Sequence, residues 1–344
     1  MMAIASMATF FSVLFCIPFV KKNALKYLKN PTQPIRNDLI IDHSSKKKVL
    51  PLGGFAIMFS VLVGLLVVVL GQYMKTKTFP ASTIFIAFGV IVASFTLGLI
   101  DDIAKITKRT TGGISGRIRF WIEIAIGLVF AYIIVMTPEP QKNIAIAFPV
   151  PFLQIFSFQI NPYLYIVFKA FVFAACLNAF NVTDGLDGLA ATQFLQFALA
   201  FLVIFLLQII SGAKMGSGSF TIITFLTLFS FAVLGFLCYN SHPATIFMGD
   251  GGSLMLGAVV AISTLLCNFE FSLLFLAFIP FIETLSVILQ VGSFKLRKGK
   301  RIFQIAPIHH HFEATGHKET KVVFNFFIVS IVISSIFIGT LFLR

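Results

Sequence analysis

The sequence predicts an all-α, polytopic membrane protein of about ten transmembrane helices, and three observations support this prediction. Apolar residues make up 58% of the 344-residue chain and charged residues 11%, with a mean hydropathy of +0.97. This composition lies far from that of soluble domains. Apolar runs close to the 20 or so residues that a bilayer-spanning helix needs recur along the chain. The basic residues are concentrated in alternate loops between these runs.

The apolar runs place the predicted helices in order. They cover residues 3–20, 52–72, 81–100, 120–136, 164–180, 191–210, 220–239, 254–267, 271–291 and 322–343. The eighth run is shorter than a bilayer-spanning helix requires. In the long loop at residues 137–163, alternating apolar residues and prolines predict a short hairpin. No repeat or soluble domain interrupts the runs, so residues 1–344 are predicted to form a single membrane domain.

The distribution of basic residues predicts the orientation in the membrane. Of the 26 Lys and Arg residues, 20 fall in the loops at 21–51, 101–119, 181–188, 240–253 and 292–321. The positive-inside rule therefore places these loops in the cytoplasm and both termini outside. Nine of the 13 acidic residues fall in the same loops, so the chemistry is predicted on the cytoplasmic face. Because these loops account for the net charge, no nucleic acid is expected as a partner.

A pair of carboxylates stands at the cytoplasmic end of the third run. Asp101 and Asp102 are adjacent, and Lys105 follows one helical turn later. A solvated helix end that faces anionic lipid would need basic residues only, and adjacent acids would weaken it. Paired carboxylates at a membrane surface suit a divalent cation or the abstraction of a proton. We therefore interpret the pair as functional.

The segment "NAFNVTDGLDGLA" brings amides, carboxylates and glycines to a membrane boundary. On a helix, Asp184 and Asp187 would share a face because they are three residues apart. A helix N-cap at Thr183 or Asp184 is the structural alternative. A cap needs one such residue, whereas this segment also offers Asn178 and Asn181, and its glycines would let a ligand approach the backbone. The segment therefore favours a binding or catalytic role.

The segment "YNSHPATIFMGDGGSL" carries Asn240, Phe247 and Asp250 ahead of the eighth run. A glycine-rich turn that opens a helix can present N–H groups to a phosphate. The same residues are also common in ordinary turns, so this motif is weak by itself.

The last cytoplasmic loop holds "APIHHHFE". Successive helical residues point about 100° apart, so His309, His310 and His311 cannot form one facial metal triad on a helix. We expect them to have different roles: phosphate contact, ring packing, or a hydrogen bond to an Asp. Glu123 and Glu283 lie within apolar runs, and acids inside a membrane are usually functional, so we expect a functional role for both. For Glu283, a hydrogen bond between helices is the alternative.

A basic segment, "HSSKKKVLPLGG", precedes the second run, and membrane anchoring explains most of its lysines. One of them, Lys46, is a candidate for substrate binding. All these groups converge where cytosol meets lipid. Such a site suits a Mg²⁺-dependent reaction between a nucleotide-linked phosphate and a lipid phosphate, because the metal offsets the repulsion between the anions.

These motifs also carry a family resemblance. The segments "IDD", "NVTDGLDGLA", "FMGDGGSL" and "ETLSVILQVGSFKLRKGKRIFQIAPIHHHFEATG" resemble the polyprenyl-phosphate N-acetylhexosamine-1-phosphate transferases. The last segment, residues 283–316, is most similar to the members that act on phospho-N-acetylmuramoyl-pentapeptide. The resemblance runs from about residue 36 to the C-terminus. The ten-helix architecture of that family, with both termini outside, agrees with the charge distribution.

The resemblance implies a reaction and a location. Phospho-N-acetylmuramoyl-pentapeptide would pass from UDP-N-acetylmuramoyl-pentapeptide to undecaprenyl phosphate, giving lipid I and UMP for peptidoglycan synthesis. Mg²⁺ would be the cofactor. The protein would be a multi-pass component of the bacterial inner (cytoplasmic) membrane, embedded in its lipid bilayer. The sequence leaves the oligomeric state open, a homodimer included.

The resemblance also implies residue roles. Asp250 would be the Mg²⁺ ligand, and Asp101 and Asp102 would lie beside the reacting phosphates, with Asp101 deprotonating the lipid phosphate. Asn181 and Asp184 would line the same site. The remaining assignments are nucleotide contacts by Lys46, Leu186, Asp187, Asn240 and Phe247, a phosphate contact by Lys105, and closure of the pocket by Gln290, His309, His310 and His311. Phe247 would offer a stacking surface for uracil.

Two other functions stay open at this point. The family usually has Thr-Pro-Thr-Met-Gly-Gly where this chain has "VLPLGG", so Pro51 replaces a threonine. This feature resembles the related enzymes that transfer N-acetylglucosamine-1-phosphate, whereas "PIHHHFE" favours the muramoyl-pentapeptide substrate. An ion or nucleotide transporter would also place acids among helices. A transporter is expected to have polar sites near the midplane and broken helices, often in related halves, whereas here the acids cluster on one face and no halves repeat.

Overall fold

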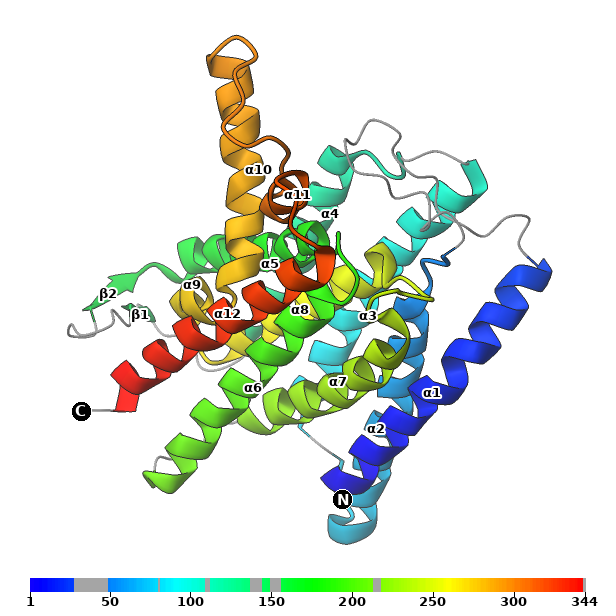
Figure 1. Cartoon of the computed structure of the whole chain (residues 1–344). Coiled ribbons are helices and arrows are strands. Elements are labelled where there is room, and N and C mark those ends of the chain that lie inside the picture. The colour runs from blue at the N-terminus through cyan, green and yellow to red at the C-terminus, as the bar shows by residue number, and fades with distance from the viewer. Residues whose placement is uncertain are drawn as a thin grey trace.

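The computed structural model describes residues 1–27, 49–79, 81–108, 112–136, 144–148, 156–212 and 218–342. Within these residues, ten helices are long and apolar enough to cross a membrane, which confirms the predicted number. They are α1 (Met2–Tyr27), α2 (Gly53–Thr76), α3 (Ser82–Lys108), α4 (Gly116–Met136), α5 (Pro162–Thr183), α6 (Leu189–Ile210), α7 (Ser219–Asn240), α8 (Gly249–Leu266), α10 (Phe278–Leu296) and α12 (Glu319–Phe342). Figure 1 shows their arrangement.

Shorter elements connect these helices. The 3₁₀ helix η2 (Glu270–Ser272) and the short helix α9 (Leu273–Leu276) lead from α8 into α10, and α11 (Ile308–Ala314) precedes α12. Between α4 and α5, β1 (Ile144–Phe148) pairs with β2 (Phe156–Ile160) in an antiparallel hairpin. The predicted hairpin is therefore confirmed. An isolated parallel bridge between Leu50 and Ile246 joins the entry to α2 with the segment between α7 and α8.

The central helix of the bundle is α8. In its most apolar window 89% of the residues are buried, against 22–61% in the other nine spans. It packs against α3 and α5, and glycines allow this close approach. A Cβ atom on Gly98 of α3 would lie 2.3 Å from the carbonyl oxygen of Asp250, and one on Gly257 would lie 2.7 Å from that of Cys176. The buried position explains why the eighth helix is so rich in small residues.

Several helices extend beyond their apolar runs, and the extensions of α3 and α8 contain the acids of interest. Helix α8 begins at Gly249, five residues before the predicted run, so it is 18 residues long and is no longer too short to span. Helix α3 continues to Lys108, so Asp101, Asp102 and Lys105 lie on its last turns. The polar ends were missed because hydropathy defines the apolar part of a helix and not its hydrogen-bonded limits.

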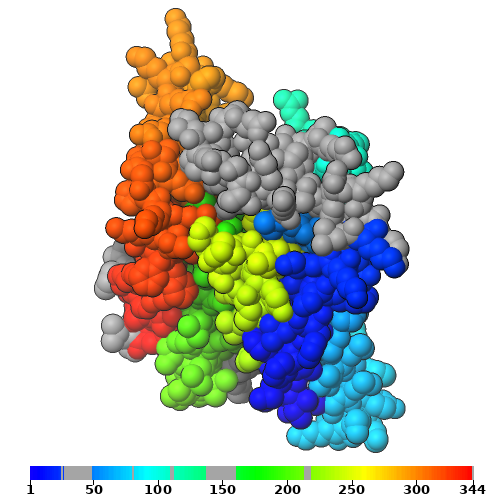
Figure 2. All heavy atoms as spheres, turned by 45° about the vertical axis from the view of Figure 1, so that its right-hand side comes forward, coloured from blue at the N-terminus to red at the C-terminus, as the bar shows by residue number. Residues whose placement is uncertain are grey.

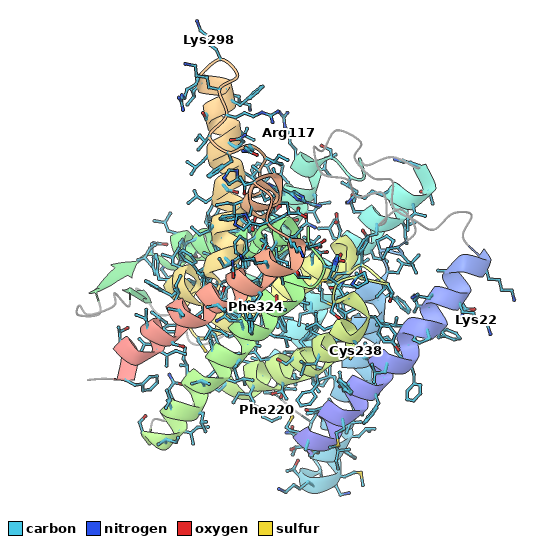
Figure 3. All side chains as sticks on the ribbon, viewed as in Figure 1. Lys22, Arg117, Phe220, Cys238, Lys298 and Phe324 are labelled. Atoms are coloured by element: carbon cyan, nitrogen blue, oxygen red, sulfur yellow. The ribbon has the colours of Figure 1, made fainter. Side chains whose placement is uncertain are left out.

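The outer helices follow one another around this core. On the face shown in Figure 2, α12, α6, α7, α1 and α2 succeed one another, and each neighbouring pair is in contact. Helix α10 instead projects from the bundle, with Lys298 just beyond its far end (Figure 3). Most of its exposed residues are apolar, including Leu285, Ile288 and Phe294. The N-terminus and the last turn of α12 lie in the lower half of Figure 1, away from that projection. Which side faces the cytoplasm stays a prediction.

Candidate active site

Asp102 caps the first turn of α8 from the neighbouring helix α3. Its carboxylate accepts the backbone N–H groups of Asp250 at 3.0 Å and Gly251 at 2.9 Å, and Asp102 is only 1% exposed. Helix α8 has no side-chain cap of its own, and an anionic acceptor at a helix N-terminus is favourable. Gly249, at φ +75°, is required here, because a Cβ would lie 2.6 Å from the Asp102 carboxylate. Asp102 thus fixes the position of Asp250.

Asp101 and Asp250 converge on one cation. The Lys105 Nζ atom lies 2.8 Å from Asp101 Oδ2 and 2.7 Å from Asp250 Oδ2. The four-residue spacing places Lys105 beside Asp101 on one face of α3, and the packing of α3 against α8 brings Asp250 to the same nitrogen. The second oxygen of Asp101 accepts the backbone N–H of Ile114. Two carboxylates that face one positive centre form a site for a cation or for a phosphate held by cations.

Arg119 is the functional candidate that sequence reasoning missed. From the first turn of α4, its guanidinium donates to Asp250 Oδ2 at 3.0 Å and to Asn181 Oδ1 at 3.0 Å. Its Nε lies 3.5 Å from a carboxylate oxygen of Glu123, one helical turn further on. Asn178 donates to the other oxygen of Glu123. The available signal was the four-residue spacing between a cation and an intramembrane acid on one helix.

The segment between α5 and α6 is a turn and not the helix on which Asp184 and Asp187 would share a face. Helix α5 ends at Thr183 with Asp184 as its C-cap, and α6 starts at Leu189 after Gly188 at φ +79°. Asp184 and Asp187 therefore do not share a helical face, because the glycines interrupt the helix between them. The N-cap alternative is also not observed, since the Thr183 hydroxyl donates to Ala179 within α5. Asn181 stays in the site and donates to Ser253 Oγ at 3.0 Å.

Residues expected at the nucleotide hold two loops together. Asn240 Oδ1 accepts the backbone N–H of Gly188 at 3.0 Å, and its amide donates to the Ile246 carbonyl at 2.9 Å. The half-buried Phe247 donates its backbone N–H to Leu50 at 2.9 Å. Leu186 is buried in an apolar cluster with Leu189, Ile279, Val322 and Phe326. Lys46 lies outside the residues that the structure describes.

Asp187 belongs to a second charged cluster. Its carboxylate lies 3.1 Å from His242 Nδ1 and accepts the backbone N–H of Ala244 at 3.0 Å. Glu319 lies 3.4 Å from the same His242 nitrogen and accepts the backbone N–H of Asp187 at 2.6 Å. Sequence reasoning did not single out His242 or Glu319. Their proximity joins three loops that only the tertiary structure brings together.

Each of the three adjacent histidines has a different partner, as their angular separation predicted. His309 Nδ1 lies 2.9 Å from Glu283, His310 Nδ1 lies 2.7 Å from Glu313, and His311 Nδ1 accepts the backbone N–H of Gln304 at 3.3 Å. Of the three, His309 is fully buried. It lies against the turn between α5 and α6, where a Cβ on Gly185 would come 2.3 Å from its Nε2.

Gln290 acts on the loop that precedes α11. Its Oε1 accepts the backbone N–H groups of Ile302 and Phe303 at 3.0 Å each, and its Nε2 donates to the Phe303 carbonyl at 2.9 Å. All of these contacts are with backbone atoms. In this structure Gln290 therefore shapes the loop that carries the histidines.

The donors around Asp250 fit Mg²⁺, which prefers oxygen ligands. Asp250 and Asp101 present two carboxylate oxygens to a common cationic position, and Asn181 Oδ1 is joined to Asp250 through Arg119. Among the described residues, Asp187, His242 and Glu319 also place ligand atoms within 4.8 Å of one another. An imidazole among the donors is typical of transition metals. The oxygen donors around Asp250 therefore suit Mg²⁺ better than the second cluster does.

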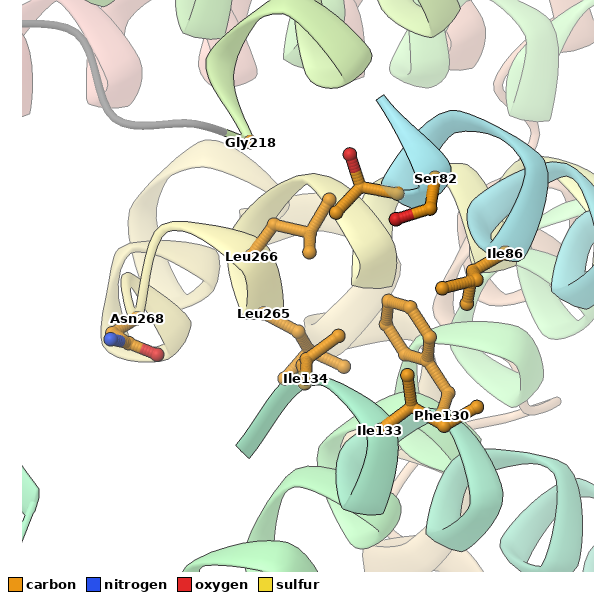
Figure 4. Close-up of a pocket in the computed structure, with 10 residues that line it drawn as sticks. Ser82, Ile86, Phe130, Ile133, Ile134, Gly218, Leu265, Leu266 and Asn268 are labelled. Atoms are coloured by element: carbon orange, nitrogen blue, oxygen red, sulfur yellow. The ribbon is translucent and has the colours of Figure 1, made fainter. Parts of the chain in front are cut away.

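The acids do not coincide with the cavity shown in Figure 4. That cavity, of about 350 Å³, lies at the opposite end of α3 and α8, and Thr83, Phe130, Leu265 and Asn268 are among its lining residues. The described residues that line it are mainly apolar and include no carboxylate. The site around Asp250 is instead filled by its own ion pairs.

The fold and the site define a class: a polytopic membrane protein whose carboxylates, amides and cations meet at one end of the central helix, an arrangement suited to phosphate chemistry. The chain belongs to glycosyl transferase family 4, whose family model matches residues 84–268. This match covers α3 to α8 and therefore includes the acids, Lys105 and Arg119.

The sequence similarity to individual relatives also covers the region of the three histidines, which lies beyond the match to the family model. The chain is 35% identical to the phospho-N-acetylmuramoyl-pentapeptide-transferase of Nautilia profundicola, over 97% of this chain and 93% of the relative. The protein of the same name from Rickettsia prowazekii is 37% identical, over 93% of this chain and 87% of the relative. That from Staphylococcus carnosus is 34% identical, over 96% of this chain and 94% of the relative. The family resemblance read from the motifs is confirmed.

Proposed function

We propose that the protein transfers phospho-N-acetylmuramoyl-pentapeptide from its UDP conjugate to undecaprenyl phosphate, giving lipid I and UMP. The relatives that match nearly the full chain carry the name of this activity. The observation that carries the proposal is the convergence of Asp101 and Asp250 on Lys105, with Arg119 beside them. Two anionic phosphates can meet only where cations offset their charge.

The chain's own residues divide this work. Lys105 and Arg119 would bind the non-bridging phosphate oxygens through charge-assisted hydrogen bonds, in place of their present contacts with Asp250. Asp250 would hold Mg²⁺, and the bound ion would stabilise the charge that develops during transfer. Asp101 would accept the proton of a monoanionic lipid phosphate. The lipid oxygen then attacks the sugar-linked phosphorus, and the bond to the UMP phosphate breaks.

The nucleotide would lie towards the loops held by Asn240. Phe247 would offer its ring to uracil. Asp187 and Lys46, which lies outside the residues that the structure describes, would also contact the nucleotide. UDP conjugates are cytosolic, so the site would face the cytoplasm of a bacterial inner membrane, in agreement with 20 of the 26 basic residues in the loops on that side.

Transfer of N-acetylglucosamine-1-phosphate is the alternative that "VLPLGG" suggested. Pro51 is buried, and its carbonyl oxygen would lie 2.4 Å from a Cβ on Gly249. In this structure Pro51 thus packs against the start of α8. The presence of proline where the family has threonine is therefore not by itself evidence for N-acetylglucosamine-1-phosphate as the transferred group. The names of the relatives favour the muramoyl-pentapeptide substrate.

Product analysis with the purified protein tests the proposal. The protein, in detergent with Mg²⁺ and undecaprenyl phosphate, is given either UDP-N-acetylmuramoyl-pentapeptide or UDP-N-acetylglucosamine. We expect lipid I and UMP from the first and no product from the second, and no UMP when undecaprenyl phosphate is omitted. A lipid-linked N-acetylglucosamine phosphate would support the alternative, and release of UMP from neither substrate would overturn both.

A further inference from the structure

A buried carboxylate–imidazole pair joins α10 to α11. Glu283 is 0% exposed and His309 is 1% exposed. Glu283 Oε2 lies 2.9 Å from His309 Nδ1 and 3.4 Å from the backbone N–H of the same residue. Because a backbone N–H can only donate, Oε2 serves as an acceptor, and the ring nitrogen beside it is the second donor. This pairing requires a hydrogen on Nδ1.

The other side of the imidazole has no partner. His309 Nε2 and Glu283 Oε1 are buried and make no hydrogen bond to the residues that the structure describes. Nε2 faces the turn between α5 and α6, where the missing side chain of Gly185 leaves room for the ring. The apolar cluster of Leu186, Leu189 and Ile279 lies in the same region and limits the access of water. A buried polar atom without a partner is costly unless a ligand supplies one.

The tautomer follows from these contacts. In a neutral imidazole one nitrogen carries the hydrogen and the other carries the lone pair. Glu283 holds the hydrogen on Nδ1, so the lone pair lies on Nε2, at the turn that contains Asp184. Carboxylates that bond the far nitrogen of a functional histidine fix both its tautomer and its orientation.

We propose that Glu283 is a positioning residue for the transfer reaction. It holds His309 so that Nε2 presents its lone pair to a hydrogen-bond donor of the sugar-phosphate substrate at the turn between α5 and α6. This inference rests on the proposed function for the identity of that substrate. Glu283 itself contacts His309 and no reacting atom, and its effect on catalysis passes through the imidazole.

A double-mutant cycle tests whether Glu283 acts through His309. Glu283→Met removes the acceptor and retains an unbranched side chain. We expect its kcat to fall about 10- to 100-fold, the usual scale for removal of such a supporting carboxylate, with KM for both substrates unchanged. Glu283→Gln keeps one carbonyl acceptor, so it should recover part of the loss. In a His309→Asn background, Glu283→Met should cause no further loss.

The matched control is Ser286→Ala, one turn further along α10. Ser286 is buried and donates only to the Glu283 carbonyl at 2.6 Å, so its removal perturbs the same helix without touching the imidazole. It should keep wild-type kcat. If Glu283→Met and His309→Asn multiply their losses, or if Glu283→Met keeps wild-type kcat, the positioning role is overturned.

A spectroscopic measurement decides the tautomer without reference to the substrate. In protein labelled with ¹⁵N-histidine, the signals that disappear in His309→Asn identify the imidazole. We expect a protonated Nδ1 and an unprotonated Nε2 in the wild type, and loss of this preference in Glu283→Met. A hydrogen on Nε2 with a bare Nδ1 in the wild type would refute the inference. If the wild type makes no lipid I, the proposed function fails, and this measurement still decides the role of Glu283.

Discussion

The carboxylate of Asp102 accepts the backbone N–H of Asp250 at 3.0 Å, although the two residues belong to different helices. The contact locks the end of α3 to the beginning of α8 and leaves the Asp250 side chain free to face Lys105 and Arg119. Adjacent acids on α3 thus have separate roles: Asp102 organises α8, and Asp101 faces the cations.

Asp102→Asn should lower both stability and turnover. The amide keeps one acceptor oxygen but places its NH₂ group against one of the two backbone N–H groups at the start of α8, and a buried unsatisfied group costs about 1–3 kcal/mol. Thermal unfolding in detergent and turnover of the same sample check this. Ser94→Ala is the control, because Ser94 is buried in α3 and bonds only within its own helix. Wild-type stability in Asp102→Asn would refute the capping role.

Asp250→Asn should remove turnover and the response to Mg²⁺ while the protein stays folded. The amide keeps the shape of the carboxylate and loses the charge that a divalent cation needs. Mg²⁺ that binds the folded state raises the unfolding temperature of the wild type by mass action, and we expect this rise to vanish in the variant. A Mg²⁺-dependent stabilisation of the same size in both proteins would move the metal site elsewhere.

Asp101→Asn should cause a loss of turnover that depends on pH. A phosphate monoester has a second pKa of about 6, so it becomes dianionic without a general base as the pH rises. A general base matters most below that pKa. We therefore expect a strong loss in mild acid and a partial recovery in mild alkali, measured with saturating Mg²⁺ and substrates. A flat, near-zero profile would indicate a covalent nucleophile, and a profile equal to the wild type would exclude both roles.

Arg119→Lys should lower kcat/KM about tenfold or more, because lysine cannot reproduce two charge-assisted hydrogen bonds in fixed directions. Arg119 donates to Asp250 and Asn181 at once. Arg117, two residues earlier on α4 and exposed (Figure 3), provides the matched control. Arg117→Lys should keep wild-type kinetics. Equal effects of the two substitutions would mean that the local charge matters and the guanidinium geometry does not.

Single cysteines test the orientation in the membrane. Lys298→Cys lies just after α10, and Lys75→Cys lies at the other end of the bundle in the last turn of α2; both positions are exposed. In a background in which the exposed Cys238 and Cys267 are serine, an impermeant maleimide should label Lys75→Cys in intact cells and Lys298→Cys only after lysis. The opposite pattern would reverse the topology and place the candidate site outside.

Most of the helices were predictable from the sequence, because a bilayer demands long apolar runs in the same places where helices form. The polar ends of α3 and α8 were not predictable from hydropathy, because contacts between the two helices, such as that of Asp102 with the start of α8, stabilise them. The spacing of Asp184 and Asp187 would have placed them on one face of a helix, but the helix is interrupted between them, where the chain has Gly185 and Gly188.

The sequence by itself determined that the acids, amides and histidines gather near the same end of the helices. Only the tertiary structure decided what each of them contacts. Arg119 and Asp250 are 131 residues apart in the chain, and their contact depends on how α4 and α8 are rotated about their axes. Successive residues on a helix point about 100° apart. Asp101 and Asp102 therefore face different neighbours, and the packing of α3 against α8 settles which acid meets the cations and which meets the backbone.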